Sequence, residues 1–179
     1  ALRVAMANCQ HLVELNLGEN PKWEKSLEEL VHTIEEATCC NTLQGLNVSG
    51  NKEFHGDVCH FGCLRQLRKL HCTWANGLTG DIASLALLLK DLQVLDVTGC
   101  SQVSGDLAGR VAPQNHLEEL RLCETKVTGN VAGLSVLAKL RLLDLRNCEE
   151  VSGDLVGLAP LKHLEELRLG GTKVAGNVA

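Results

Sequence analysis

The chain has 179 residues and a formal net charge of −5, with 45% hydrophobic residues but only 2% aromatic ones. This acidic balance and the scarcity of aromatic rings argue against a nucleic-acid-binding protein, which would show a basic surface and stacking side chains. The longest apolar run, residues 82–89, is too short to cross a bilayer, so we expect no membrane insertion.

The first predicted elements are a short strand within residues 12–17 and a helix over about residues 21–37. Asn20 suits the position that caps a helix N-terminus, and Pro21 suits the first helical turn. Five apolar side chains fall on one face of this helix, which we expect to pack on the next coil: Trp23, Leu27, Leu30, Val31 and Ile34.

A ladder of the form L-x-x-L-x-L recurs along the whole chain. Its last two apolar positions alternate with polar ones, as in a short strand with one buried face. The first leucines of the seven ladders are separated by 31, 24, 25, 25, 23 and 24 residues. The ladders are Leu12/Leu15/Leu17, Leu43/Leu46/Val48, Leu67/Leu70/Cys72, Leu92/Leu95/Val97, Leu117/Leu120/Leu122, Leu140/Leu143/Leu145 and Leu164/Leu167/Leu169.

A ladder with this period resembles the leucine-rich repeat. In that family the residue three positions after the ladder holds a side chain that bonds the backbone of adjacent coils. This turn slot carries Asn20, Asn51, Ala75, Cys100, Thr125, Cys148 and Thr172. The resemblance therefore implies bonding by Asn and, with less capacity, by Thr, whereas cysteine is a weak donor and alanine cannot bond.

A glycine phrase follows each of the last six ladders, with its glycine at Gly56, Gly80, Gly105, Gly129, Gly153 and Gly176. Glycine permits a backbone conformation that other residues resist, so we expect a corner here. The phrase is similar to that of plant-type repeats, which implies a short second strand. Apolar residues beyond it predict short helical turns on the convex side.

These patterns predict an α/β solenoid. We expect a leucine-rich repeat horseshoe with a parallel β-sheet on its concave face and short helical or irregular convex segments. Residues 1–179 would form a single domain of about seven coils, with a helix-containing first repeat at 12–42 and both ends truncated or uncapped. Residues 116–132 and 163–179 are identical at 14 of 17 positions, which indicates duplication of a two-coil unit.

The exposed strand positions form the candidate site. The middle column of the concave face reads Asn16, Asn47, His71, Asp96, Arg121, Asp144 and Arg168, and its last four charges alternate in sign. Because parallel strands lie about 4.8 Å apart, each carboxylate can reach a guanidinium group on the strand above or below, so this strip either neutralises itself or recognises a partner. The predicted contact residues are Lys69, His71, Trp74, Val94, Asp96, Glu119, Arg121, Leu142, Asp144, Arg146 and Arg168, among which Trp74 is the first choice because aromatic residues are enriched at binding hot spots.

Other sites find little support. The cluster His55, Cys59, His60, Cys63, His71 and Cys72 lacks the spacing of a zinc finger. The column Asp57, Asp81, Asp106, Asn130, Asp154 and Asn177 offers one oxygen-bearing side chain per coil, which favours local turn bonding over calcium binding. Neither a nucleophile elbow nor a P-loop is present. We therefore expect no metal, no cofactor and no enzymatic activity.

The chain has nine cysteines. Cys59, Cys72, Cys100 and Cys148 read as small buried apolar residues, and the vicinal pair Cys39–Cys40 as structural. Paired cysteines of the kind that cap secreted leucine-rich repeat proteins are not visible. This favours a reducing compartment and an intracellular, cytoplasmic location.

The sequence as a whole predicts a non-enzymatic module that binds a protein partner through its concave face. Three alternatives stay open: an architectural subunit that packs end to end through its open coils, the substrate receptor of a ubiquitin ligase, and an extracellular receptor ectodomain.

Overall fold

A computed structural model describes residues 6, 9, 11–20, 26–37, 41–107 and 116–176. The expectations for Pro21, Trp23, Cys39, Cys40 and Asn177 lie outside these residues.

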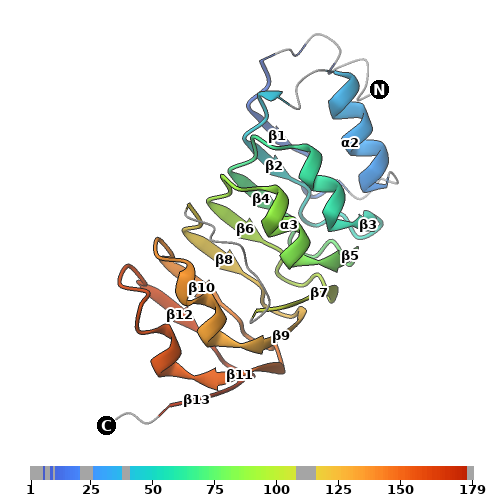
Figure 1. Cartoon of the computed structure of the whole chain (residues 1–179). Helices are drawn as coiled ribbons and strands as arrows, with labels where there is room; N and C mark the ends of the chain where they lie inside the picture. The colour runs from blue at the N-terminus through green and yellow to red at the C-terminus, as the bar shows by residue number, and fades with distance from the viewer. Residues whose placement is uncertain are drawn as a thin grey trace.

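The coils stack into an elongated, curved array (Figure 1). The ladders form a parallel sheet of seven strands, in the order β1-β2-β4-β6-β8-β10-β12. Each ladder pairs with the next in register, so that Leu46, for example, lies opposite both Leu15 and Leu70. The strands are β1 Glu14–Asn16, β2 Gly45–Asn47, β4 Lys69–His71, β6 Val94–Asp96, β8 Glu119–Arg121, β10 Leu142–Asp144 and β12 Glu166–Arg168.

The glycine phrases form a second parallel sheet, in the order β13-β11-β9-β7-β5-β3. This confirms the predicted second strand in the six coils that carry the phrase. Gly80 shows why glycine is needed: its φ is +104°, and a Cβ atom there would lie 2.3 Å from Oδ1 of Asp57 in the preceding coil. The strands are β3 His55–Asp57, β5 Gly77–Asp81, β7 Gln102–Asp106, β9 Lys126–Asn130, β11 Glu150–Asp154 and β13 Lys173–Ala175.

Short helical segments cover the convex side, as predicted. They are η2 Val58–Cys63, α3 Ile82–Leu88, η3 Val131–Val136 and η4 Leu155–Leu158. Each begins directly after an Asp or Asn whose carboxylate or amide oxygen accepts a hydrogen bond from the backbone N–H two residues on; from Asp57 to Cys59 the distance is 2.9 Å. This column therefore caps the convex helices, in agreement with the predicted local bonding.

The helix of the first repeat begins later than predicted. α2 spans Leu27–Glu36, and Ser26 rather than Asn20 is its N-cap. The Ser26 hydroxyl accepts a bond from the Glu29 N–H, while the Glu29 carboxylate accepts one from the Ser26 N–H. Such a reciprocal capping box satisfies two backbone donors at once, which fixes the start of the helix. Leu27, Leu30 and Ile34 are fully buried beneath it.

The turn slot joins neighbouring coils through more than asparagine. Asn51 Nδ2 donates to the carbonyl oxygens of Leu17 and Val48, and Asn51 Oδ1 accepts from the Asn20 N–H. The Cys100 thiol donates to the Cys72 carbonyl at 2.9 Å. The Thr125 hydroxyl donates to the Leu122 carbonyl of its own coil and also contacts the Cys148 thiol of the next coil, 3.7 Å away. Cys72, Cys100 and Cys148 are fully buried in the core, as predicted, and the thiols of Cys100 and Cys148 donate hydrogen bonds as well. The prediction was wrong for Cys59, which is only half-buried.

Candidate functional site: the concave sheet

The solvent side of the ladder sheet presents three aligned columns of side chains. Strand register places Lys69, Val94, Glu119, Leu142 and Glu166 in the first column. The same register places His71, Asp96, Arg121, Asp144 and Arg168 in the middle column, and Arg146 follows Asp144 in the third. The predicted alignment of the strand residues on one face is thus correct.

The charges of the middle column pair differently from the prediction. Arg121 binds Glu119 of its own strand, two residues away on the same face. Arg168 likewise binds Glu166, with Nε 2.7 Å from Oε1. Only Asp144 reaches an arginine on the neighbouring strand, where its Oδ2 lies 3.4 Å from Nη1 of Arg168. Most of these ion pairs therefore run along the strands rather than between them.

Asp144 is the most constrained charge of the site. It is 1% exposed, and Arg146 donates to it through Nε at 2.9 Å and through Nη2 at 2.6 Å. Burial alone would raise the pKa of this carboxyl, but the hydrogen bonds from Arg146 and Arg168 outweigh it and hold the pKa below its usual value. Asp144 therefore stays charged and holds two guanidinium groups in place.

The asparagine and aspartate residues of the middle column also close the turn that follows each strand. Oδ1 of Asn16, Asn47, Asp96 and Asp144 accepts the backbone N–H two residues on, at 2.9 to 3.1 Å. This is the Asx-turn, which the short side chains of Asn and Asp favour. The sequence analysis missed this structural role, although the recurrence of Asn and Asp at four of the seven positions of the column could have revealed it.

Trp74 lies at the edge of the sheet and is 49% exposed. Its φ is +59°, and its indole lies over Gly99 of the next coil, where a Cβ atom would be 2.4 Å from Cε3. The ring is thus both packed across the turn and open to solvent. Glycine at position 99 leaves room for it.

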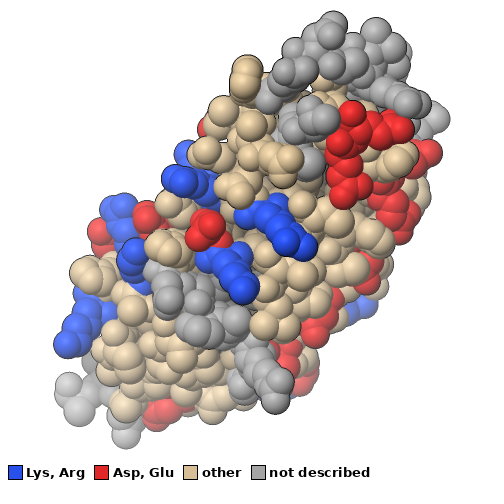
Figure 2. Space-filling view, turned by 45° about the horizontal axis from the view of Figure 1, so that its top comes forward, with Lys and Arg blue, Asp and Glu red and all other residues tan. Residues whose placement is uncertain are grey.

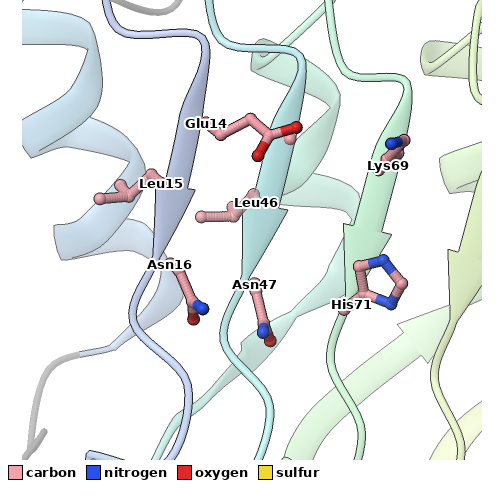
Figure 3. A pocket seen from close by; sticks show the side chains of 8 residues that line it. Glu14, Leu15, Asn16, Leu46, Asn47, Lys69 and His71 are labelled. Atoms are coloured by element: carbon pink, nitrogen blue, oxygen red, sulfur yellow. The ribbon is translucent and has the colours of Figure 1, made fainter.

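The first coils enclose a hollow of about 280 Å³ that the sequence did not indicate (Figure 3). The Glu14 side chain crosses over Gly45, where a Cβ atom would be 3.1 Å from Glu14 Cγ, and points towards β4. Within the described part of the chain, neither Glu14 nor Lys69 has an ion-pair partner. The lining residues are Glu14, Leu15, Asn16, Gly45, Leu46, Asn47, Lys69 and His71.

No metal or membrane feature competes with this surface in the parts of the chain that the structure describes. No group of three or more His, Cys, Asp or Glu side chains is placed to hold a metal ion there. None of the helices that can be described combines the length and the apolar character that a bilayer span requires.

The same fold is found in solved leucine-rich repeat structures. An internalin of Listeria monocytogenes matches 95% of this chain over 44% of its own length, with 21% identity and a TM-score of 0.68. The Arabidopsis receptor kinase HAESA, solved with the peptide hormone IDA and the co-receptor SERK1, matches 94% over 27% of its length, with 22% identity and a TM-score of 0.64. Mouse RP105, in its complex with MD-1, matches 92% of this chain over 29% of its own length, with 22% identity and a TM-score of 0.58.

No protein-family model matches the sequence, and no curated protein matches it closely. The repeat, the two parallel sheets and the structural matches together define the chain as a protein with the leucine-rich repeat fold. It spans less than half the length of each of the three proteins just described.

Proposed function

We propose that this chain is a non-enzymatic protein-interaction module whose concave sheet binds a partner, and that the N-terminal half of that sheet makes the principal contact. The observation that carries the proposal is the hollow over β1, β2 and β4, together with Trp74 in the turn that follows β4. It combines two charges without ion-pair partners among the described residues, Glu14 and Lys69, with a half-exposed indole at the edge of the same sheet. Aromatic residues such as Trp are enriched at binding hot spots.

The C-terminal half plays the lesser part in this proposal. Arg121, Arg146 and Arg168 are each neutralised by a carboxylate. A partner that used them would have to break an existing ion pair. Val94 and Leu142 are half-buried apolar side chains between these charges and would add contact area at the edge of the site.

The structural matches support an interaction role. HAESA was solved with the peptide hormone IDA, GASSHO1/SCHENGEN3 with CASPARIAN STRIP INTEGRITY FACTOR 2, and RP105 with MD-1. These proteins share the fold of this chain. An extracellular receptor fragment is accordingly the second candidate, alongside the architectural and ubiquitin-ligase alternatives.

We also propose an intracellular location. Cys100 and Cys148 are fully buried thiols that donate hydrogen bonds to the preceding coil, and burial raises the pKa of Cys100 to about 12. Their structural role depends on the reduced form. The test is maleimide labelling of protein from its natural source, denatured without reductant. All nine cysteines should react if the protein is intracellular, whereas cysteines protected as disulfides would favour a secreted protein.

The test compares proteins captured by the natural chain and by matched variants. Trp74→Ala and Lys69→Glu should each weaken binding of a specific partner at least about tenfold in calorimetric titration. The controls are Val156→Ala, which trims an exposed convex side chain, and Lys126→Glu, which makes the same charge change on the second sheet. If the partner bound the two concave-face variants and the two control variants with equal affinity, the contact would lie elsewhere.

Light scattering, which measures the oligomeric state, distinguishes the architectural alternative from binding of a partner by the concave face. A chain that self-associates at high concentration, with the concave variants unchanged, would favour end-to-end packing over a concave-face partner.

A further inference from the structure

A basic row lies along the turns that lead from the convex helices into the ladder strands. We call the residues 65–68, 90–93, 116–118, 139–141 and 162–165 the basic edge. It holds six lysines and arginines, against the three acidic residues Asp91, Glu118 and Glu165, in a chain whose net charge is −5. All six cations are exposed: Arg65, Arg68, Lys90, Lys139, Arg141 and Lys162.

Hydrogen bonds of the backbone fix the spacing of this row. The N–H of Gln93 donates to the carbonyl of Arg68, Glu118 to Gln93, Arg141 to Glu118, and Glu165 to Arg141, at 2.7 to 2.8 Å. Successive coils are therefore held at the spacing of parallel strands, roughly 4.8 Å. The basic edge is a rigid row in which four of the five turns carry at least one lysine or arginine.

Most of these cations are not neutralised. Arg141 binds Glu165 through Nε and Nη2, at 3.0 and 2.9 Å. Among the residues that the structure describes, Arg65, Arg68, Lys90 and Lys162 take part in no ion pair. A hollow of about 250 Å³ opens on this edge between Glu118, Lys139, Arg141, His163 and Glu165.

The opposite edge of the convex side is acidic. There the helix-capping residues Asp57, Asp81 and Asp154 lie in one column at the end of the second-sheet strands, with Asp106 and the neutral Asn130 between Asp81 and Asp154. Figure 2 shows acidic side chains mostly along the right edge of the face, and lysines and arginines at its centre and left. The short helices run from one edge to the other, so the surface is polarised across the solenoid.

We propose that the basic edge binds an extended acidic segment of a partner protein. Charge complementarity over several coils favours an acidic chain, and the spacing of the row suits one that runs along the solenoid axis. The aromatic residues Phe54 and Phe61 are buried and Trp74 lies at the other end of the strands, so the row lacks the stacking side chains that single-stranded nucleic acid needs.

A second copy of this chain fits the row less well. Two copies of net charge −5 repel each other. The carboxylates of Asp57, Asp81 and Asp154 are also occupied by hydrogen bonds to the helix N-termini. The inference goes beyond the concave-face proposal, because it concerns a different surface.

The probe is a fluorescein-labelled peptide of alternating Glu and Ser, with a Gln-Ser peptide of the same length as the uncharged control. Fluorescence anisotropy should show binding of the acidic peptide alone at about 50 mM NaCl, and clear weakening at about 300 mM, because salt screens exposed charges. Failure to bind the Glu-Ser peptide at low salt, or equal binding of both peptides, would overturn the proposal.

The variants locate the site. Arg68→Glu with Lys90→Glu should reduce the affinity at least about tenfold, whereas Lys52→Glu with Lys126→Glu, which changes the net charge equally at other exposed positions, should change it less than about twofold. Trp74→Ala should leave peptide binding unchanged, which separates this test from that of the concave face.

Three results would contradict the assignment to this edge. These are equal loss in the two charge-reversal pairs, loss in Trp74→Ala, and a salt-sensitive dimer in light scattering that the Arg68→Glu/Lys90→Glu pair abolishes. Circular dichroism of each variant confirms that the fold is intact.

Discussion

The Cys148 thiol donates a hydrogen bond to the carbonyl oxygen of Leu122, one coil earlier, across 3.0 Å. Asn51 occupies the same slot in its own coil and makes three such bonds to the chain around it. Asn and Cys in this slot thus serve one purpose by two chemistries, which is to tie their turns to the preceding coil.

Replacing Asn51 should cost more stability than replacing Cys148. Asn51→Ala leaves buried backbone groups without partners and should lower the free energy of unfolding by about 2–3 kcal/mol, whereas Cys148→Ala should lower it by about 1 kcal/mol, because Thr125 still bonds the Leu122 carbonyl. Urea denaturation followed by circular dichroism measures both. Equal losses would contradict the difference in bonding.

Asp144 should make the protein sensitive to acid. Its pKa is lowered in the folded state, so its stabilising contribution is present above the unfolded value of about 3.9 and is lost as the pH falls through the folded value. Asp144→Asn should therefore melt at a lower temperature at pH 7, with a difference from the natural chain that shrinks below about pH 4.

The control for this experiment is Asp154→Asn. Asp154 is an exposed helix cap, and Asn130 fills the same position in the preceding coil, so the amide can keep the bond to the backbone. A melting profile against pH that is the same for both variants would contradict the role of Asp144.

Gly99 and Trp74 should show coupled effects on stability. Gly99→Ala places a methyl group against the indole and in a backbone conformation with φ of +76°, and should cost about 2 kcal/mol or more. In a Trp74→Ala background the clash is removed and only the backbone strain of about 1 kcal/mol remains. A double-mutant cycle by urea unfolding measures the difference, and strictly additive effects would rule out the contact.

Ser26 should stabilise the first repeat. Ser26→Ala removes the hydroxyl that accepts the Glu29 N–H and should cost about 1 kcal/mol. Ser26→Asp retains an acceptor at the same place and should restore most of that loss. Thermal unfolding monitored by circular dichroism compares the three proteins. A Ser26→Ala variant with the melting temperature of the natural chain would show that the cap contributes nothing.

The ladder leucines and the glycine phrases predicted both sheets, because their order along the chain is the order of the coils in space. Leu46 and Leu70 are buried in register because each coil repeats the one before it. In the same way, a glycine recurs at one position of the repeat and predicted a corner there. The φ of +104° at Gly80 confirms that corner. A periodic sequence predicts such features because each coil stacks on a similar coil, so the same positions meet at every step.

Only the tertiary structure decided how the side chains use this frame. Alternating charges predicted bonds between strands, yet Arg121 pairs within its own strand, where Glu119 lies two residues away on the same face. The hollow below Glu14 exists because Gly45 on the next coil has no side chain, and the start of α2 depends on Ser26 rather than Asn20. Rotamers, caps and hollows depend on neighbours across coils, and the one-dimensional repeat does not specify those contacts.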